Sequence, residues 1–168
     1  MTPLRLGLLL ASLVLVLDQA SKFWIVHVFA LGERPPLRLL PVLDLVLAHN
    51  RGISYSLFRS DGPIGRLVLI GVALAALGII AVWISRTHSR LTAAALGLVA
   101  GGAAGNVIDR IASGAVIDFL YFHTPFSLGP LSNYVFNVAD AAIVAGVLLL
   151  LYESFTAARR PGERPEAR

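Results

Sequence analysis

The sequence predicts an α-helical integral membrane protein with four transmembrane helices. Of its 168 residues, 57% are hydrophobic and only 14% are charged, whereas a soluble domain carries about 25% charged residues. Four apolar stretches are each close to the roughly 20 residues that a helix needs to cross a bilayer. These expected spans cover residues 4–27, 63–84, 91–111 and 134–152. The length suits one unit, so we expect a single membrane domain over residues 1–155.

The first span begins with a charged residue and ends near small residues, as a secretory signal peptide also does. However, its apolar stretch continues through residues 23–26, and three more spans follow. Asp18, Gln19 and Lys22 also make the candidate cleavage site atypical. We therefore expect a retained helix. Asp18 and Lys22 are four residues apart with the acid first, which favours an ion pair on one helix face.

Two segments between the spans are not membrane helices. Prolines, glycines and scattered charges interrupt residues 31–62. Within them, residues 37–47 alternate weakly and are rich in Leu and Val, which predicts short strands. Residues 53–58 are typical of a strand end or of a short helix lying at the membrane surface. The second segment, residues 112–133, contains a β-prone run after a Ser-Gly break, and the charged tail, 156–168, is expected to be disordered.

The basic residues indicate how the chain crosses the membrane. With four spans, both ends of the chain lie on one side, together with the loop between the second and third spans. That side holds seven basic residues: Arg5, Arg86, Arg90, Arg159, Arg160, Arg164 and Arg168. Residues 112–133 hold none, so the positive-inside rule puts both termini in the cytoplasm. Because no basic patch is interleaved with aromatic residues, the net charge of +4 does not indicate a nucleic-acid partner.

The third span ends in an unusual run of glycines and polar residues, Gly101-Gly102-Ala103-Ala104-Gly105-Asn106-Val107-Ile108-Asp109-Arg110. In a helix, Gly102, Asn106, Asp109 and Arg110 fall roughly on one face. Two of the glycines are four residues apart and would let a neighbouring helix approach closely. Asp109 is expected to pair with a cation such as Arg110 or to support the fold. Helix packing alone would explain one interfacial charge, but several polar groups at membrane depth indicate a functional site.

The predicted topology gathers polar residues at the outer membrane surface. The third span ends there, and the fourth begins there with Asn137 and Asp140, the latter six residues inside the predicted span. Asp118 follows the Ser-Gly break, so the chain can fold back and bring it to the same level. Two carboxylates that share a site do not both ionise easily, so one can hold a proton while the other activates a water. We expect Asp118 and Asp140 to be such a pair, although each alone is also typical of a helix cap or an ion-pair partner.

The sequence gives less support to metal-dependent, Ser-Lys and non-enzymatic functions. The chain has no cysteine, and its four histidines show neither metal-ligand spacing nor an H-E-x-x-H motif, so neither a metal nor a cofactor is expected. Ser21 with Lys22 could form a Ser-Lys catalytic pair, but Asp18 would keep Lys22 charged. Two non-enzymatic alternatives stay open: a small transporter or proton-relay subunit, which would need polar residues through the whole membrane depth, and a non-catalytic membrane assembly factor.

Five sequence blocks, in order, resemble bacterial lipoprotein signal peptidase, also called signal peptidase II. They are Asp18-Gln19 with Lys22, Asn50-Arg51-Gly52 leading to Ser56, the run from Gly101 to Arg110, Val116-Ile117-Asp118-Phe119, and Phe136-Asn137-Val138-Ala139-Asp140. Their order, their spacing and the four spans match from about residue 10 to residue 150. The resemblance implies an aspartic endopeptidase of the bacterial inner membrane. It would cleave prolipoproteins just before the diacylglyceryl-modified cysteine of the lipobox.

The resemblance also implies a role for each polar residue. The implied catalytic pair is Asp118 and Asp140; the residues that bind substrate or hold the site are Asn50, Gly52, Asn106, Arg110 and Asn137; the supporting positions are Asp18, Lys22 and Asp109. A small extracytoplasmic β-cradle and a short surface helix would fit residues 31–62. The active site would face the periplasm. The expected partners are prolipoproteins, membrane lipids and globomycin-type inhibitors, and the protein is expected to act as a monomer.

Overall fold

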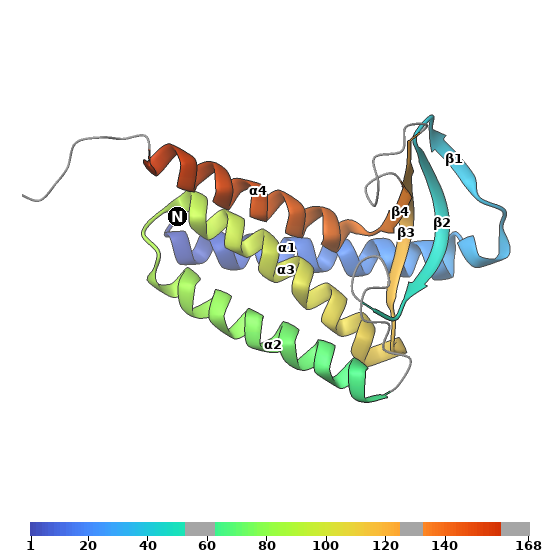
Figure 1. The fold of residues 1–168 in the computed structure, drawn as a ribbon, viewed down its shortest axis with the longest axis horizontal. Helices are drawn as coiled ribbons and strands as arrows, with labels where there is room; N and C mark the ends of the chain where they lie inside the picture. Colours follow the sequence, from blue (N-terminus) through green and yellow to red (C-terminus); the bar gives the residue numbers. More distant parts are fainter. Residues whose placement is uncertain (53–62, 125–132, 159–168) are drawn as a thin grey trace, which may run out of the picture.

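The computed structural model describes residues 1–52, 63–124 and 133–158 of the chain. These residues form four long helices: α1 (Pro3–Phe23), α2 (Pro63–Arg86), α3 (Arg90–Ser113) and α4 (Val138–Ala158). The helices run along the molecule, and a small sheet stands across one end of them (Figure 1). The surface helix expected at residues 53–58, and most of the predicted tail, lie outside the described residues.

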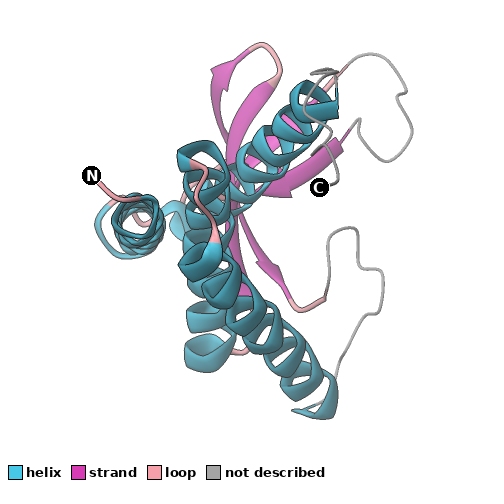
Figure 2. Cartoon of the chain, turned by 90° about the vertical axis from the view of Figure 1, so that its left-hand side faces the viewer, coloured by secondary structure: helices cyan, strands magenta, loops and turns pink. Residues whose placement is uncertain are grey.

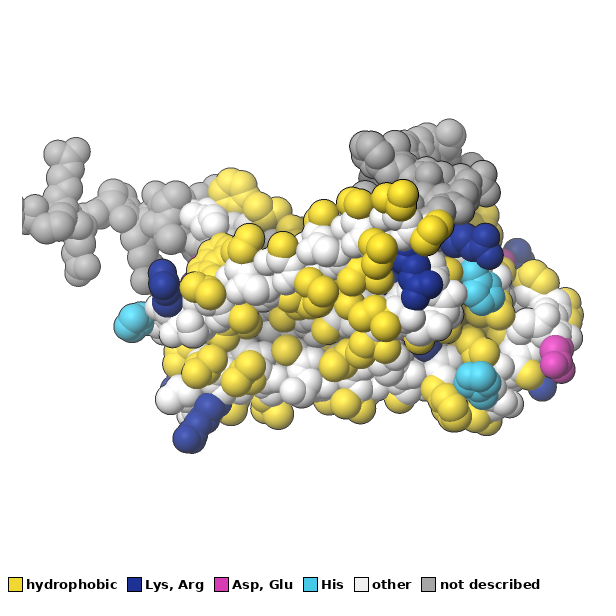
Figure 3. Space-filling model, turned by 90° about the horizontal axis from the view of Figure 1, so that it is seen from below, with side chains coloured by type: hydrophobic (Ala, Val, Ile, Leu, Met, Phe, Trp, Pro, Cys, Tyr) yellow, Lys and Arg dark blue, Asp and Glu magenta, His cyan; other side chains and the backbone are white. Residues whose placement is uncertain are grey.

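All four helices are long and apolar enough to cross a membrane. Their outward-facing surfaces are apolar: hydrophobic side chains cover the middle of the molecule, while Lys, Arg and His lie towards its two ends (Figure 3). α2 is an extreme case, because only Ile84 is buried among its side chains. Such surfaces suit a lipid solvent, in which apolar side chains need no protein cover. The four-span prediction is confirmed.

α3 packs against both α1 and α4 through glycines. Gly97, Gly101 and Gly105 recur at successive turns and face α1, where a Cβ on Gly101 would come within 2.5 Å of the Ala11 carbonyl oxygen. This confirms the predicted close approach at Gly101 and Gly105. Gly102 faces α4 instead, against Ala139. α3 therefore holds one neighbouring helix on each of two glycine faces.

α1 leads into the sheet through a short irregular connection. It continues as a π-helical turn, Trp24–Val28, and the chain reverses at Ala30, whose φ of 52° is left-handed. A 3₁₀ turn, Leu31–Glu33, follows. Buried side chains from this connection pack against the sheet in one cluster: Ile25, Leu31, Leu45 and Phe119. The cluster fixes the sheet to the end of α1.

The sheet is antiparallel, with the strand order β1-β2-β3-β4. Its strands are β1 (Leu37–Leu40), β2 (Leu43–Asn50), β3 (Val116–His123) and β4 (Asn133–Phe136). The first two confirm the strands predicted in residues 37–47. β3 follows α3 after Gly114, whose φ of 81° ends the helix in the left-handed conformation. Seen along the bundle from the end that carries the N-terminus, the strands lie beyond the helices (Figure 2).

The predicted start of the fourth span, residue 134, is wrong. Residues 133–136 pair with residues 120–123 as strand β4, and α4 begins only at Val138. Asn137 accounts for the boundary: its side-chain oxygen accepts a hydrogen bond from the Asp140 main-chain nitrogen (2.9 Å), while the Asp140 carboxylate accepts one from the Asn137 nitrogen (3.3 Å). This reciprocal pair is a helix-capping box. Asp140 therefore lies in the first turn of α4 rather than six residues inside a span.

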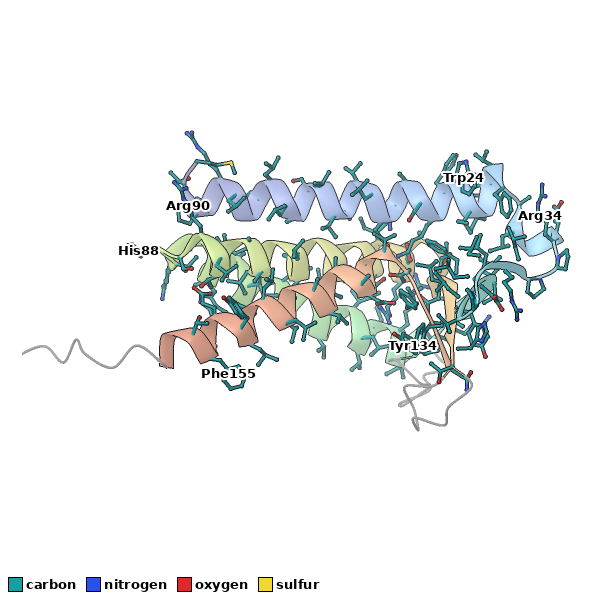
Figure 4. The ribbon with its side chains drawn as sticks, turned by 90° about the horizontal axis from the view of Figure 1, so that it is seen from above. Trp24, Arg34, His88, Arg90, Tyr134 and Phe155 are labelled. Carbon is teal, nitrogen blue, oxygen red and sulfur yellow. The ribbon has the colours of Figure 1, made fainter. Side chains whose placement is uncertain are left out.

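The opposite end of the molecule holds a separate polar contact between helices. Figure 4 shows His88, Arg90 and Phe155 at that end, and Trp24, Arg34 and Tyr134 at the sheet end. Glu153 of α4 accepts hydrogen bonds from the hydroxyls of Ser89 and Thr92. The Ser89 hydroxyl also caps α3 by accepting from the Thr92 nitrogen at 3.1 Å. Glu153 thus ties α4 to the start of α3, far from the sheet.

We expect Glu153→Ala to lower stability and to leave any activity at the sheet end unchanged. It removes two interhelical hydrogen bonds, each typically about 0.6 kcal/mol in a membrane protein. Thermal unfolding in detergent should therefore show a loss of about 1 kcal/mol. The same sample should react at the wild-type rate. A large loss of activity at full folding would contradict the separation of the two ends.

Candidate active site

A buried ion cluster joins α1 to α3. The Lys22 ammonium lies 2.8 Å from Asp18 Oδ2 and 2.7 Å from Asp109 Oδ2, and all three side chains are buried. The predicted Asp18–Lys22 pair is confirmed. The expectation that Asp109 pairs with a cation is confirmed, but the cation is Lys22 of α1 rather than the suggested Arg110. Pairing is required here, since a lone buried charge is very costly.

Asp118 lies on β3 and is 2% exposed. Each of its two carboxylate oxygens accepts a hydrogen bond from a side-chain amide. Asn137 Nδ2 donates to Oδ1 at 2.7 Å, and Asn50 Nδ2 donates to Oδ2 at 3.2 Å. Sheet pairing contributes to this contact, because β2 ends at Asn50, opposite the start of β3. The two amides orient the carboxylate and leave no freedom to rotate without breaking a hydrogen bond.

Asp140 receives a matching pair of hydrogen bonds. Asn106 Nδ2 of α3 donates to Oδ1 at 2.9 Å, and the Asn137 main-chain nitrogen donates to Oδ2. The side-chain nitrogen of Asn137, Nδ2, also donates to Asn106 Oδ1 at 3.3 Å, and Asn137 is fully buried. Asn137 therefore links Asp118, Asn106 and Asp140. Asp118 and Asp140, which were predicted to meet, share Asn137 as a hydrogen-bond partner where β3, β4, α3 and α4 converge.

Arg110 links the main chain just after β2 to the α3 residues beside Asp140. Its Nη2 donates to the Gly52 carbonyl oxygen at 2.9 Å, and its Nη1 donates to the Asn106 carbonyl oxygen at 3.3 Å. The Gly52 nitrogen in turn donates to Asn50 Oδ1 at 3.0 Å. The buried Arg110 Nε has no hydrogen-bond partner in the described part of the chain. Arg110 thus holds the main chain beside Asn50.

The structure places every predicted site residue within this connected set. It also adds Gln19, which was not among the predicted site residues. Gln19 Nε2 lies 3.0 Å from Asp109 Oδ1, 3.2 Å from Asp18 Oδ2 and 3.3 Å from the Gly105 carbonyl oxygen. Its position three residues before Lys22, on the same face of a helix, was the signal that could have identified it.

The Ser-Lys alternative does not fit the geometry. The Ser21 hydroxyl donates to the Asp18 carbonyl oxygen at 2.8 Å, while the Lys22 ammonium contacts two carboxylates. The Lys22 side chain is therefore paired with two carboxylates rather than with Ser21. Among the residues that the structure describes, no three His, Cys, Asp or Glu side chains are grouped as metal ligands.

Burial and, to a smaller extent, the negative charge of Asp140 raise the pKa of Asp118 to about 7. Hydrogen bonds from Asn50 and Asn137, and the charge of Lys22, oppose the increase. An ordinary aspartate would be ionised at neutral pH, since its pKa is about 3.9. Near pH 7 this site can therefore hold one proton between two carboxylates, which is the state that an acid–base pair needs.

We expect activity to fall as the pH rises above about 7, because the pair then loses its shared proton. The apparent pKa of this descending limb belongs to the pair. The stability of the folded protein also falls as the pH rises. The folded-state pKa of Asp118 lies above the unfolded value, so its proton stabilises the fold at low pH, and this contribution is lost between about pH 4 and pH 7. A pH–rate profile that rises steadily through pH 8 would contradict the assignment.

Comparisons with known proteins decide the family. The model of the family "Signal peptidase (SPase) II" matches residues 10–156. The lipoprotein signal peptidase of Nitrobacter hamburgensis is 51% identical over 92% of this chain and 94% of its own length. That of Beijerinckia indica is 53% identical over 93% and 91%. The chain belongs to the signal peptidase II family. Signal peptidase II is a family of aspartic peptidases, and the predicted resemblance is confirmed.

Solved structures agree with the fold. A bacterial membrane enzyme solved by the in meso method at 2.3 Å resolution matches with a TM-score of 0.79 and 22% identity, covering 96% of this chain and 94% of that one. A second, at 1.9 Å, matches with a TM-score of 0.73 over 88% and 91%. The family match, the bacterial relatives and the four apolar helices together make the chain a bacterial, multi-pass membrane member of signal peptidase II.

Proposed function

We propose that this member of signal peptidase II removes signal peptides from prolipoproteins with Asp118 and Asp140 as its catalytic pair. The observation that carries the proposal is the hydrogen-bonding of a buried carboxylate, Asp118, and a partly buried one, Asp140, each by two donors, at the junction of the sheet and the membrane helices. Asn50, Asn106 and Asn137 would orient these carboxylates. Gly52 and Arg110 would hold the neighbouring main chain and contact the substrate.

The chemistry requires only these two carboxylates and a water. The ionised aspartate takes a proton from the water as its oxygen attacks the scissile carbonyl carbon. The protonated aspartate donates its proton to the carbonyl oxygen, so no free oxyanion forms. When the intermediate collapses, one of its two hydroxyl groups returns a proton to the pair as the carbonyl re-forms, the C–N bond breaks, and the leaving nitrogen takes up a proton from the pair. The pair ends with one proton, as it began.

The position of the site suits a membrane-embedded substrate. A signal-peptide helix lies in the bilayer, and a diacylglyceryl-modified cysteine at its end is anchored at the membrane surface. We propose that cleavage occurs just before this cysteine. The apolar outer surfaces of the helices would contact membrane lipids, and the Arg110 Nε, for which the described residues offer no hydrogen-bond partner, would bind a substrate carbonyl. Globomycin-type inhibitors would compete for the same groups, and the protein would act as a monomer.

We further propose that both termini are cytoplasmic and that the sheet and the active site face the periplasm. Arg5, Arg86 and Arg90 support this orientation, since they belong to the end of the bundle opposite the sheet. Anchoring by arginine at the cytoplasmic side is the usual pattern in multi-pass proteins. A substrate whose signal peptide has been inserted from the cytoplasm then presents its lipidated cysteine at the outer surface.

The proton-relay alternative conflicts with the charge distribution. A relay would need ionisable groups through the whole membrane depth. Each helix instead has a long stretch without any charged residue: 6–17, 67–85, 91–108 and 141–152. The charged residues of the helices lie towards the two ends of the bundle.

The test is cleavage of a defined substrate by the purified protein in detergent. A prolipoprotein carrying the diacylglyceryl group should be cut, and mass spectrometry should find the lipidated cysteine at the new N-terminus. The matched control is the same precursor without the lipid, which should be cut at least about tenfold more slowly, because burying one acyl chain supplies several kcal/mol. Cleavage at another bond, or no cleavage of the lipidated precursor, would refute the proposed specificity.

A further inference from the structure

We propose that Asp18, Lys22 and Asp109 form a charged bridge that sets the positions of both catalytic aspartates. The three are positioning residues and do not contact the substrate. This inference rests on the proposed catalytic function of Asp118 and Asp140. Its basis is that each end of the bridge is hydrogen-bonded to the main chain one residue before a catalytic aspartate.

The first end of the bridge holds Asp140. Asp18 Oδ1 accepts a hydrogen bond from the Ala139 main-chain nitrogen at 3.0 Å, while its Oδ2 lies 2.8 Å from the Lys22 ammonium. Ala139 lies in the first turn of α4, where main-chain nitrogens have no partner within the helix. A carboxylate from α1 fills this role, so the height and rotation of α4 at Asp140 depend on Asp18.

The second end holds Asp118. Asp109 Oδ2 accepts a hydrogen bond from the Ile117 main-chain nitrogen at 3.1 Å and lies 2.7 Å from the same Lys22 ammonium. Ile117 belongs to β3, which the chain enters only after the break at Gly114. The contact therefore fixes the start of β3 against α3. Asp118, the next residue, is placed by it.

Lys22 is the common member that joins the two ends. Asp118 and Asp140 come from different elements, β3 and α4, so their separation depends on what ties those elements together. The Lys22 ammonium contacts both bridge carboxylates and also lies 3.3 Å from Asn106 Oδ1, while Asn106 Nδ2 donates to Asp140. A single buried cation thus sits between both supports of the pair.

Helix packing alone does not account for a charged bridge. α1 already packs closely on α3 through Gly97 and Gly101. Buried ion pairs are often no more stabilising than apolar residues of the same size, whereas they define one arrangement. Asp18 is fully buried and Lys22 is 2% exposed, so their desolvation is nearly complete. The cluster is better explained by the geometry it imposes than by stability.

The bridge also has an electrostatic effect that can be measured. The charged groups that act on Asp118 come from three helices: Asp140 of α4, Lys22 of α1 and Arg110 of α3. The positive charge of Lys22 lowers the pKa of Asp118. Removing that charge should move the descending limb of the pH–rate profile to higher pH. A residue with a merely structural role would leave this limb where it is.

The experiment compares Lys22→Met and Asp109→Asn with Glu153→Ala, the matched control for loss of a polar contact between helices at the far end. Lys22→Met should lower kcat by about 100-fold, the effect expected of a 1 Å misplacement, with KM changed by less than about twofold because the groups that contact the substrate remain. Asp109→Asn keeps an oxygen for Ile117 and should cost about tenfold. The double variant should be no worse than Lys22→Met, since both changes break one unit. Glu153→Ala should keep the wild-type kcat and pH limb.

Folded Lys22→Met and Asp109→Asn proteins with wild-type kcat and an unmoved pH limb would overturn the bridge. If Lys22→Met does not fold, the nearly isosteric Asp109→Asn decides by itself: a normal kcat overturns the proposal, and a lowered kcat with unchanged KM supports it. Asp118→Asn and Asp140→Asn are measured alongside. If they are inactive while the bridge variants are normal, only the bridge is wrong. If they still cut, the proposed function itself is wrong.

Discussion

Asp140→Asn and Asp118→Asn should each lower the rate of signal-peptide cleavage by at least about 10³-fold, within the range that general acid–base groups contribute. An asparagine keeps the shape of the aspartate but can neither take a proton from water nor donate one as an acid. The two side chains then cannot take up a proton from water and donate one to the substrate. The measurement is cleavage of the lipidated precursor followed by gel shift, with single-turnover conditions to separate chemistry from product release.

The matched control for this loss is Asp44→Asn. Asp44 lies on β2 of the same sheet, and its carboxylate contacts His123 Nε2 at 3.3 Å and Arg38 Nε at 3.7 Å rather than the catalytic pair. We expect activity within about twofold of wild type, as is usual for a change of weak ion pairs near a surface. Folding of all three variants is checked by thermal unfolding. Substantial cleavage by either pair variant would make that aspartate a structural residue.

Gly102→Val is the second change with a large expected effect, here on stability as well as activity. A Cβ at this position would collide with the Ala139 carbonyl oxygen and come within 2.8 Å of the Ile143 side chain. A main-chain atom cannot rotate away, so α4 must move off α3, at a cost of about 3 kcal/mol, the upper end of typical overpacking. Ala139 precedes Asp140, so the surviving folded protein should also be slow.

The comparison for Gly102→Val is the same substitution at Gly78 of α2, where a Cβ would meet nothing within 4 Å. Gly78→Val should change the midpoint of thermal unfolding little, because the added methyl groups face lipid. Equal losses at both positions would mean that valine destabilises these helices for reasons other than crowding. A loss at Gly102 alone would confirm that the distance between α3 and α4 is set by this glycine.

The helices were predictable from the sequence because lipid imposes a simple requirement on it. A spanning helix must be predominantly apolar over about 20 residues, so α2 begins at the predicted residue, Pro63, and α1 and α3 begin within one residue of the prediction. The meeting of Asp118 with Asp140 followed from topology, since both residues come next to the same ends of spans. Neither conclusion needed detailed side-chain geometry.

The sheet and the partners of the charges were harder to predict. β2 pairs with β3 across more than 60 residues of sequence, for example Asn50 with Val116, and no local pattern encodes that register. The pairing of Asp109 with Lys22 depends on how α1 is rotated against α3, which the glycine contacts decide. The start of α4 had a local signal that was overlooked, the Asn137-Val138-Ala139-Asp140 capping box.

The direct joining of β4 to α4 restricts how this chain can change in length. Only Asn137 separates the last strand residue, Phe136, from the first helical residue, Val138. One inserted residue would turn the rest of α4 by about 100° about its axis and carry Asp140 away from Asn106. Insertions and deletions should therefore be eliminated by selection between residues 133 and 140, while the ends of the chain are free to lengthen. Among sequences of this family, the number of residues across this junction should be more strictly conserved than the identity of most residues within it.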